Sequence, residues 1–583
     1  MATVLRPFIQ PFIQHRFVRP AHYQNPPSYR RSDSNVIPAY YTTAGNADAT
    51  LRPDDPHIKK VNKQSFDKQR AIEQLTRGTG AWQDWNQDGK TDISYHFKEI
   101  GGNRFSETQK QEARRSIQSW GDVANLTFTE NGSRAEGRLS FQTSSTEKAA
   151  SGFFPSPFAN GGDTVYNPDF VTRPTITHEI GHALGLTHPG DYNITADDTK
   201  RLYAQDSKAH TVMSYYLAQD SGKTLVDRPK APMMDDISAI QHKYGANHQT
   251  RRENNTYGFN SNSGRDYYSL RNHHDPAVFC VWDGAGNDTL DFSGYGNDQV
   301  INLKAGSFSD VGGYQGNVSI ARDCDIENAI GGSGHDALIG NDADNRLTGG
   351  GGADRLRGGR GADTFVYNHA RDSTPEAPDE IMDFTSGLDK IDVSGALRSA
   401  GLASLSLVST WSGKAGEARL SHDEKSGEGM LAIDLTGNGK PDLLIKTHGR
   451  VRPGDILPAN NRTPKRGPVP ESLIQPVRPT VNAVNVRPHF VFKTASDSTF
   501  SNARLFTDFT SGTDKLDLRG IEKEAKTRLT PVNAFSGRAG ETIVGYNPQT
   551  YRYFVAIDLT GNGTPDFLVK STQEIKPKDI LVN

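Results

Sequence analysis

Residues 331–366 read GGSGHDALI GNDADNRLT GGGGADRLR GGRGADTFV, four consecutive segments of nine residues each. The eighth position of every segment is apolar, and it is occupied by Leu338, Leu347, Leu356 and Phe365. The sixth position carries an acid or an amide, namely Asp336, Asn345, Asp354 and Asp363. A flexible glycine-rich linker has no reason to keep an apolar residue in phase. The period of nine therefore predicts a parallel β-roll, in which each segment forms a turn and a short strand.

The same segments predict calcium sites. Their glycines make turns that expose carbonyl oxygens and their aspartates add carboxylates, so neighbouring turns can offer Ca²⁺ the hard oxygen ligands that it prefers. DGAGNDTLD at 283–291 has the same form, whereas Asn341 and Asn345 depart from it and weaken the second segment. Because the core of such a roll is small, we expect it to fold only on binding calcium. The predicted calcium-binding residues are Asp288, Gly331, Gly332, Gly334, Asp336, Gly349, Gly350, Gly352, Asp354, Gly358, Gly359, Gly361 and Asp363.

Upstream of the roll, residues 178–188 read HEIGHALGLTH, the pattern H-E-x-x-H-x-x-G-x-x-H. Positions i and i+4 share one face of a helix, so His178 and His182 can point at one metal ion. Gly185 is suited to end that helix, because only glycine takes left-handed backbone angles cheaply, and the chain can then turn back with His188. HExxH alone also fits an ordinary helix with two structural histidines, but the extended string favours a zinc site. Three protein ligands leave a position open for water, which is typical of a catalytic zinc.

Two further residues complete the predicted active site. Glu179 lies one step round the helix from His178, where it can act as general base on a zinc-bound water. The string TVMSYY at 211–216 resembles the Met-turn that follows the same motif in metzincin zinc proteases. A phenol such as Tyr215 is a sensible hydrogen-bond donor to a developing oxyanion, although an exposed structural tyrosine is equally common.

Longer stretches narrow the resemblance to one family. They are HPGDYN at 188–193, PMMDDISAIQHKYGAN at 232–247, YGFNSNSGRD at 257–266 and INLKAGSFSDVGG at 301–313. Together with the two motifs above, they resemble the serralysins, the secreted alkaline zinc proteases of Gram-negative bacteria. The resemblance implies that Tyr215 ligates zinc at rest and swings away to support the transition state. It also implies an RTX-type calcium roll, type I secretion, a monomeric enzyme and a small periplasmic protein inhibitor as a partner.

The part after the roll is duplicated. DFTSGLDKIDVSG at 383–395 recurs as DFTSGTDKLDLRG at 508–520, and AIDLTGNGKPDLLIK at 432–446 recurs as AIDLTGNGTPDFLVK at 556–570. Between the copies lies a segment rich in Pro and Arg, which reads as a semi-rigid linker. We therefore expect a multidomain α+β protein whose zinc-protease domain has a mixed sheet, followed by the roll and two β-sandwich-like modules. The predicted divisions are a disordered prosegment at 1–60, the metzincin domain at 61–247, the roll at 248–380, a module at 381–457, the linker at 458–489 and the second module with an export signal at 490–583.

Composition excludes several classes of protein. The net charge of -3 and the pI near 6.6 argue against a nucleic-acid partner, and no run of about 18 apolar residues is present to span a membrane. The Arg-rich start lacks the continuous apolar stretch of a secretory signal peptide. These features agree with a secreted protein that leaves the cell by type I secretion.

Three alternatives stay open. The loop 84–92, DWNQDGKTD, and the two DLTGNGxPD loops of the tail can bind calcium or form plain Asx turns. Cys280 and Cys324 can pair or remain buried thiols. The whole chain can be an RTX adhesin with a vestigial protease domain, or a host-directed toxin whose duplicated tail binds a receptor. The intact Glu179 and three histidines favour the active endopeptidase, which hydrolyses protein and peptide substrates with Zn²⁺ and Ca²⁺ as cofactors.

Overall fold

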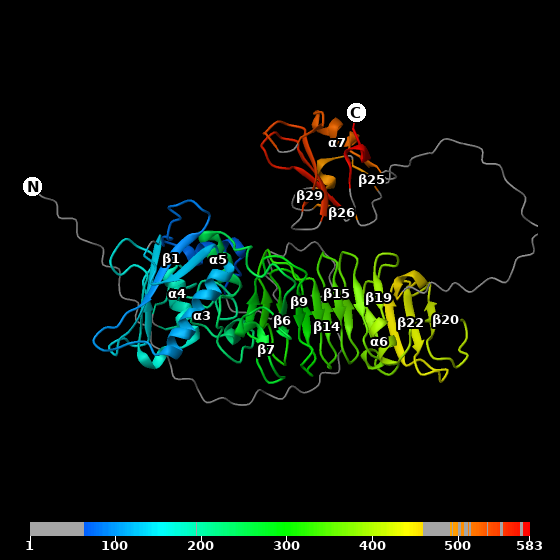
Figure 1. Cartoon of the computed structure of the whole chain (residues 1–583), viewed down its shortest axis with the longest axis horizontal. Coiled ribbons are helices and arrows are strands. Elements are labelled where there is room, and N and C mark those ends of the chain that lie inside the picture. The colour runs from blue at the N-terminus through cyan, green and yellow to red at the C-terminus, as the bar shows by residue number, and fades with distance from the viewer. Residues whose placement is uncertain are drawn as a thin grey trace, which may run out of the picture. The chain divides into compact units, whose positions relative to one another are not determined.

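The computed structural model describes residues 63–458 except 134 and 194, and residues 490–582 except 493, 499–502, 507–510, 512–514, 533–534, 548–551 and 572–574. The chain forms two compact units, Met1–Thr463 and Pro464–Asn583, shown in Figure 1. The predicted prosegment at 1–60 and nearly all of the predicted linker at 458–489 lie outside the described residues.

The first unit begins with a five-stranded sheet in the order β2-β1-β3-β5-β4. Strands β2, β1, β3 and β5 pair in parallel, whereas β4 pairs antiparallel with β5 and forms one edge of the sheet. The buried side chains of β1 alternate, as a strand with one covered face requires. The bounds are β1 Thr91–Phe97, β2 Leu126–Glu130, β3 Gly137–Thr143, β4 Ala150–Gly152 and β5 Asp163–Tyr166.

Four helices accompany this sheet (Figure 1). They are α2 Lys68–Thr76, α3 Glu107–Val123, α4 Arg173–Ala183 and α5 Met234–Tyr244. A capping box between Ser106 and Gln109 begins α3, and the Thr172 side chain accepts the Thr175 N–H at the start of α4. Trp120 of α3 is fully buried and donates its indole N–H to the Thr177 carbonyl, 3.2 Å away, which ties α3 to α4.

The nonapeptide segments form the predicted parallel β-roll, and its strands confirm that prediction. Successive segments alternate between two sheets, so each strand pairs in parallel with the strand two segments away; Leu338 on β14 pairs with Leu356 on β16. One sheet runs β24-β19-β17-β15-β13-β9-β6-β7, and a second runs β10-β14-β16-β18-β23-β22-β21-β20. A smaller sheet has the order β11-β12-β8.

The strands of the first large sheet are β6 Thr256–Phe259, β7 Ser269–Leu270, β9 Thr289–Asp291, β13 Asn328–Ile330, β15 Arg346–Thr348, β17 Thr364–Val366, β19 Lys390–Asp392 and β24 Ile456–Leu457. Those of the second are β10 Val300–Asn302, β14 Ala337–Ile339, β16 Arg355–Arg357, β18 Asp379–Ile381, β20 Ser406–Leu407, β21 Glu417–His422, β22 Glu428–Asp434 and β23 Leu443–His448. The small sheet contains β8 Phe279–Val281, β11 Phe308–Ser309 and β12 Val318–Ile320, and the short helix α6 spans Ser394–Ser399.

The in-phase apolar residues fill the core of the roll. Leu338, Leu347, Leu356 and Phe365 are all 0% exposed. The glycine turns allow the segments to stack closely: Gly350 has φ +102°, and a Cβ there would lie 2.0 Å from the Gly332 carbonyl oxygen. A side chain at this position is excluded both by its backbone angle and by its neighbour.

The first module is continuous with the roll. Strand β18 pairs in parallel with β23, and β19 pairs in parallel with β24, so both large sheets pass through the predicted boundary at 380–381 without a break. Strands β23, β22 and β21 then form an antiparallel meander. The predicted boundary therefore lies within β18, and the antiparallel pairing begins only between β23 and β22.

The second unit repeats these strand orders by itself. Its sheets are β25-β27-β32 and β26-β31-β30-β29-β28, which match β17-β19-β24 and β18-β23-β22-β21-β20 of the first unit in order and direction. Its elements are β25 Phe490–Val491, β26 Arg504–Phe506, β27 Leu516–Asp517, α7 Arg519–Ala525, β28 Thr530–Pro531, β29 Glu541–Asn547, β30 Arg552–Asp558, β31 Phe567–Ser571 and β32 Ile580–Leu581. A separate apolar core that includes Phe492, Leu516, Val555 and Phe567 supports it.

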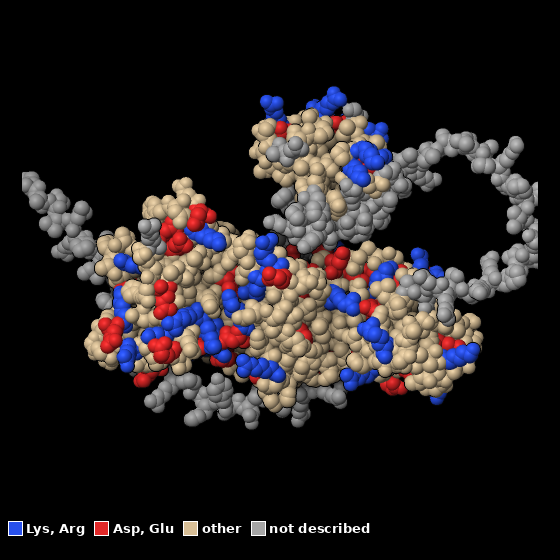
Figure 2. All heavy atoms as spheres, viewed as in Figure 1, with Lys and Arg blue, Asp and Glu red and all other residues tan. Residues whose placement is uncertain are grey.

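Three general features bear on the sequence analysis. Cys280 and Cys324 are both buried and unpaired with each other. Within the described ranges, no helix has the length and apolar character needed to cross a bilayer. On the face drawn in Figure 2, Lys and Arg are interspersed with Asp and Glu over the first unit, so this face carries no continuous basic surface for nucleic acid.

The in-phase residues of the roll should dominate its stability. We expect Leu356→Ala to lower the free energy of unfolding by about 2–5 kcal/mol, because a fully buried leucine leaves a cavity. Leu407→Ala is the matched control, since Leu407 is 39% exposed, and should change it by less than about 0.5 kcal/mol. Urea unfolding followed by circular dichroism in calcium measures both. Equal losses at the two positions would contradict the assignment of the core.

Candidate functional site

The three predicted zinc ligands converge. Helix α4 carries His178 and His182 on one face, and the chain leaves the helix through Gly185, whose φ of +96° lies in the left-handed region. This turn brings His188 back, so that its Nε2 lies 3.1 Å from His182 Nε2 and 3.3 Å from His178 Nε2. All three side chains are buried, and their ligand atoms lie within 4.8 Å of one another.

Each histidine ring is oriented by a backbone carbonyl. The Nδ1 of His178 lies 2.8 Å from the Val212 oxygen, that of His182 lies 2.7 Å from the Leu186 oxygen, and that of His188 lies 3.0 Å from the Tyr192 oxygen. Since a carbonyl only accepts, each Nδ1 donates, and the lone pair of each Nε2 is directed at the common centre. Burial lowers the pKa of His182 to about 4, which keeps the ring in the neutral form that binds a metal. This donor set fits a transition-metal ion held by three imidazoles.

Glu179 is fully buried beside the first histidine. Gly152 on the edge strand β4 packs against it so closely that a Cβ there would lie 2.6 Å from the Glu179 carbonyl oxygen and 3.2 Å from its Oε2. Burial raises the pKa of Glu179 well above its usual range, the negative charge of Glu147 adds to this, and Lys208 opposes it. The carboxyl group is therefore next to both the histidine cluster and the sheet edge.

The Met-turn lies under the histidines. Met213 is fully buried, and its sulfur contacts helix α4 at Gly181, where a Cβ would lie 2.5 Å from Sδ. The glycine between Glu179 and His182 is therefore required for the thioether to approach the helix. A larger residue at 181 would push the Met-turn away from the ligands.

The ring of Tyr215 joins the same cluster. Its centroid lies 4.4 Å from that of His188, 5.0 Å from that of Tyr192 and 5.9 Å from that of His178. The Tyr215 hydroxyl donates to the Asn193 carbonyl oxygen over 3.4 Å. The structure thus brings the predicted tyrosine to the histidine cluster, and its role as a ligand stays a prediction.

Two buried carboxylates that the motifs do not contain hold the loop around the Met-turn. Asp236, at the start of α5, accepts from the Thr211 hydroxyl at 2.5 Å and from the Val212 N–H at 2.7 Å. Asp206 accepts from the Tyr192 hydroxyl at 2.8 Å and from the Ser214 hydroxyl at 2.6 Å. Burial raises the pKa of Asp236 to about 7 and that of Asp206 to about 6. Acids are rarely buried without such partners. Asp236 lies in the stretch 232–247 that carries the family resemblance, but no pattern in the sequence predicts that either acid is buried.

The roll places its aspartates in two ladders. In one, Asp354 Oδ1 accepts the Asp336 N–H at 2.8 Å, and Asp379 Oδ1 accepts the Asp354 N–H at 2.9 Å. In the other, Asp363 accepts the Asn345 N–H at 2.8 Å, and Asp389 accepts the Asp363 N–H at 3.1 Å. The structure therefore brings together the predicted aspartates of successive turns.

These carboxylates are costly to ionise. Burial, aided by the neighbouring acids, raises the pKa of Asp354 to about 10 and that of Asp363 to about 8. The Oδ2 atoms of Asp354 and Asp379 are buried and have no hydrogen-bond partner among the described residues. Stacked, buried acids with unmatched oxygens and adjacent glycine carbonyls fit a divalent cation with hard oxygen ligands. The predicted glycines 331, 332, 334, 349, 350, 352, 358, 359 and 361 all lie in these turns.

Sequence periodicity missed several acids of the same ladders. Asp379 and Asp389 follow Asp354 and Asp363 by more than two segments, so they fall out of the nine-residue phase. Asp288 likewise has a partner outside its segment, because its N–H donates to Glu327 Oε2 at 2.7 Å. Burial and the charge of Asp283 raise the pKa of Asp288 to about 9. Only strand pairing reveals these neighbours.

The tail loops contain Asx turns, and calcium binding by them stays a prediction. Asp434 accepts the N–H groups of Gly437, Asn438 and Gly439, and Asp558 accepts the corresponding three in the second unit. In the loop 84–92, Asp84 accepts the Gly89 N–H and other side chains cap neighbouring amides. These oxygens accept from backbone amides, as in Asx turns, whereas Asp84 Oδ1 is buried and has no hydrogen-bond partner among the described residues.

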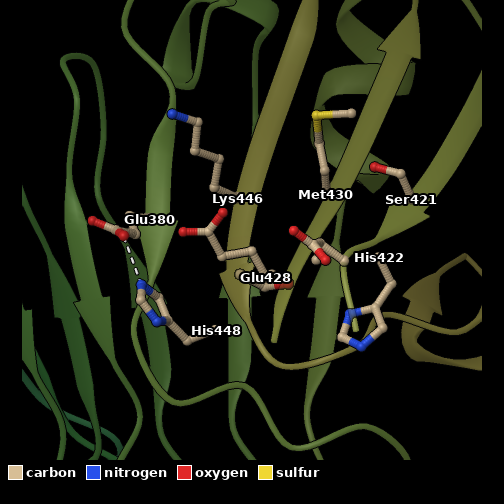
Figure 3. Close-up of a pocket in the computed structure, with 10 residues that line it drawn as sticks. Glu380, Ser421, His422, Glu428, Met430, Lys446 and His448 are labelled. Atoms are coloured by element: carbon tan, nitrogen blue, oxygen red, sulfur yellow. Dashed lines mark hydrogen bonds and ion pairs between the residues drawn. The ribbon is translucent and has the colours of Figure 1, made fainter. Parts of the chain in front are cut away.

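A separate hollow of about 290 Å³ lies on the first module (Figure 3). Glu380 from β18 and His448 from β23 pair there, with Nε2 2.6 Å from Oε1, and Glu428 lines the same hollow. At the matching positions the second copy has Arg552 for Glu428 and Thr572 for His448. The residues that pair in this hollow differ between the two copies, and the hollow shares no residue with the histidine cluster.

Comparison with known proteins shows which family the chain resembles. Residues 246–457 and again 481–582 match the family described as Peptidase M10 serralysin C terminal. "Metalloprotease AprA" of Pseudomonas entomophila (strain L48) is 46% identical over 440 residues, which cover 68% of this chain and 91% of the relative. "Metallopeptidase AprA" of Pseudomonas marginalis is 42% identical over 442 residues, covering 68% and 92%, and "Serralysin C" of Dickeya chrysanthemi is 43% identical over 435 residues, covering 67% and 89%.

Asp206 should make the stability of the protease part depend on pH. Its folded pKa of about 6 lies above the value of about 3.9 in an unfolded chain, so its contribution is present at low pH and is lost as pH rises through 6. The asparagine side chain of the Asp206→Asn variant does not titrate. Between pH 4 and 7 the free energy of unfolding of the wild type should therefore fall by about 2 kcal/mol relative to the variant. Denaturant unfolding at several pH values measures this difference, and a constant difference would contradict the buried, protonatable state.

Proposed function

The chain belongs to the serralysin family and is a metalloendopeptidase, and on that premise we propose that it is a secreted, zinc-dependent enzyme folded and activated by calcium. The observation that carries the zinc assignment is the convergence of three buried Nε2 atoms whose Nδ1 atoms all donate to carbonyls. His178, His182 and His188 would hold the ion, with Tyr215 at their side. When bound, zinc would supply Lewis acidity, which lowers the pKa of a coordinated water toward about 7 and polarises the scissile carbonyl.

Glu179 is the proposed general base. It accepts a proton from the attacking water and passes it to the leaving amine. Its burial next to His178 and His182 keeps bulk water from competing for that proton. The Tyr215 hydroxyl donates a hydrogen bond to the oxyanion that develops on the substrate carbonyl.

The substrate is proposed to bind as an extended strand. Strand β4 is the edge of its sheet and adjoins Glu179 and His182 through Gly152. An extended peptide can add to such an edge through main-chain hydrogen bonds, which do not depend on its side chains. Phe154 follows β4 and packs edge-on to His182 with ring centroids 5.6 Å apart, which makes it a candidate wall of the cleft.

Calcium is proposed to fold the roll. Without a cation, the stacked carboxylates must take up protons or repel one another, because Asp354 is buried beside Asp336 and Asp379, and Asp363 beside Asp389. A divalent ion bound between the turns removes that cost, so its binding free energy becomes folding free energy. The protease would remain unfolded wherever free calcium is scarce.

The remaining predictions form part of the same proposal. We propose an extracellular location reached by type I secretion, a monomeric enzyme and a small protein inhibitor, with the domain divisions given above. An RTX adhesin with a vestigial protease domain is the second candidate. The unbroken set of His178, Glu179, His182 and His188 disfavours it, since an adhesin would have no use for them.

Glu179→Gln tests the base. We expect proteolysis to fall by about 10²–10⁴-fold, while one equivalent of zinc stays bound because all three histidines remain. Glu107→Gln is the matched control: it makes the same change at the surface of α3, where Glu107 pairs with Lys110, and should retain full activity. Kinetics on a fluorogenic peptide and elemental analysis give both readings.

The wild type should also clear casein in a zymogram and lose this activity in 1,10-phenanthroline, whereas an adhesin would clear no casein.

Removing calcium tests the roll. We expect EGTA to abolish much of the far-UV circular dichroism of the strands and to expose apolar surface, because the buried carboxylates then lack a counter-ion. Millimolar calcium should restore the signal. Magnesium at the same concentration should not, since it demands tighter octahedral geometry and dehydrates reluctantly. A spectrum unchanged by EGTA would contradict the calcium proposal.

A further inference from the structure

The first turns of the roll contact the loop that carries the Met-turn. Both belong to the first compact unit. The contacts involve Arg322, which follows β12, and Phe308 on β11, and they reach the protease part at His210, Lys223 and Asp235. Phe308 and Asp235 lie within the stretches 301–313 and 232–247 quoted above, but nothing in those stretches indicates these contacts.

The Arg322 contact is a buried ion pair. Arg322 Nη1 lies 2.7 Å from Asp235 Oδ1 and 3.3 Å from Ser238 Oγ, both on α5. The Asp235 side chain is 1% exposed and that of Arg322 is 14% exposed. Breaking a pair so deeply buried leaves a carboxylate without its counter-charge, so the pair firmly determines where α5 begins relative to the roll.

A short series of hydrogen bonds connects this point to a metal ligand. The Asp235 N–H donates to the His210 carbonyl at 2.9 Å. The adjacent Asp236 accepts the Val212 N–H at 2.7 Å. The carbonyl of that same Val212 accepts from His178 Nδ1 at 2.8 Å. Asp235 and Asp236 of α5 therefore hold the loop whose Val212 carbonyl orients His178.

Phe308 supports the same loop from the roll. Its ring centroid lies 4.9 Å from that of His210, and Lys223 Nζ lies 4.2 Å above it. Lys223 is fully buried, and Gly316 of the roll leaves room for its stem, since a Cβ there would lie 2.0 Å from Lys223 Cδ. Thr224 and Gln315 exchange hydrogen bonds of 2.8 and 2.6 Å beside it.

We propose that Arg322 is a positioning residue for the metal site: through Asp235 and the adjacent Asp236, the folded roll holds the Val212 carbonyl that orients His178. The inference rests on the proposed metal-dependent function. It gives the roll a role in completing the active site, in addition to its own calcium-dependent folding. Partners that orient a ligand histidine typically change metal affinity or activity by about 10–100-fold when lost.

A second ion pair across the same contact provides a matched control. Arg265, just before the short helix at Asp266–Tyr268, lies 2.7 Å from Asp122 of α3. The side chain of Asp122 is bonded to Arg251, Arg265 and Tyr267. These partners lie in the roll and its approach, so this pair joins the same two parts of the chain without passing through Val212.

The experiment uses the full-length protein saturated with calcium and zinc. It compares the wild type with Arg322→Gln, Arg322→Lys, Arg265→Gln and the double variant Arg322→Gln with Asp235→Asn. The double variant removes both charges, so it avoids the unpaired carboxylate that could unfold the single one. Circular dichroism confirms folding. Zinc release to a chelating dye and kcat and KM on a peptide are then measured.

We expect Arg322→Gln and the double variant to release zinc about 10–100-fold faster and to lose kcat with KM within about twofold. Arg322→Lys should restore the release rate to within about threefold, and Arg265→Gln should match the wild type. Wild-type release and kcat in the folded double variant would overturn the proposal, and so would equal losses in Arg265→Gln, which would indicate a general effect of the interface. A wild type that binds no zinc and cleaves no peptide would instead refute the proposed function.

Discussion

The hydrogen bond from each ligand histidine to a backbone carbonyl is the constraint on which the site depends. A free imidazole can rotate and exchange its proton between two nitrogens. Here the Val212, Leu186 and Tyr192 carbonyls remove that freedom, so the three Nε2 atoms face one point. Each carbonyl is supplied by a different part of the chain after the helix. The metal centre is therefore only as ordered as the turn at 185–188 and the loops that follow it.

This dependence explains why so many polar groups are buried around 206–236. Asp236 and Asp206 hold the Met-turn from two sides, and Lys208 donates to the Val212 and Ser214 carbonyls. Burial lowers the pKa of Lys208 to about 7, because the charged ammonium group is poorly solvated there. Such groups are unfavourable one by one and are tolerated because each is hydrogen-bonded. The acids of the roll face a similar penalty, which a bound cation would offset under the calcium proposal above.

The linear motifs predicted most residues of the candidate site but few of the residues that hold them in place. HEIGHALGLTH predicted that His178, His182 and His188 meet and that the chain reverses at Gly185, as the structure has it. Zinc binding by them and the role of Glu179 as base stay predictions. The period of nine predicted the parallel strands and the buried Leu338, Leu347, Leu356 and Phe365, which the structure confirms. Asp379 and Asp389 escaped that reasoning because an irregular excursion separates them from the last segment. The ion pair between Arg322 and Asp235 could not be predicted in this way, because the two residues are distant in sequence and follow no period.

By itself, the sequence determined the features that local geometry controls: which residues share a helix face, where glycine allows a reversal, and which side chains enter a repeating core. It also revealed the duplicated tail, because repeated strings need no coordinates to be recognised. Only the tertiary structure decided that the first module continues the sheets of the roll. It also decided that aspartate oxygens in the tail loops accept hydrogen bonds from backbone amides. It alone joined α5, the Met-turn and the roll through buried charges. Burial and pairing between distant segments depend on how the whole chain packs, and no local pattern encodes that.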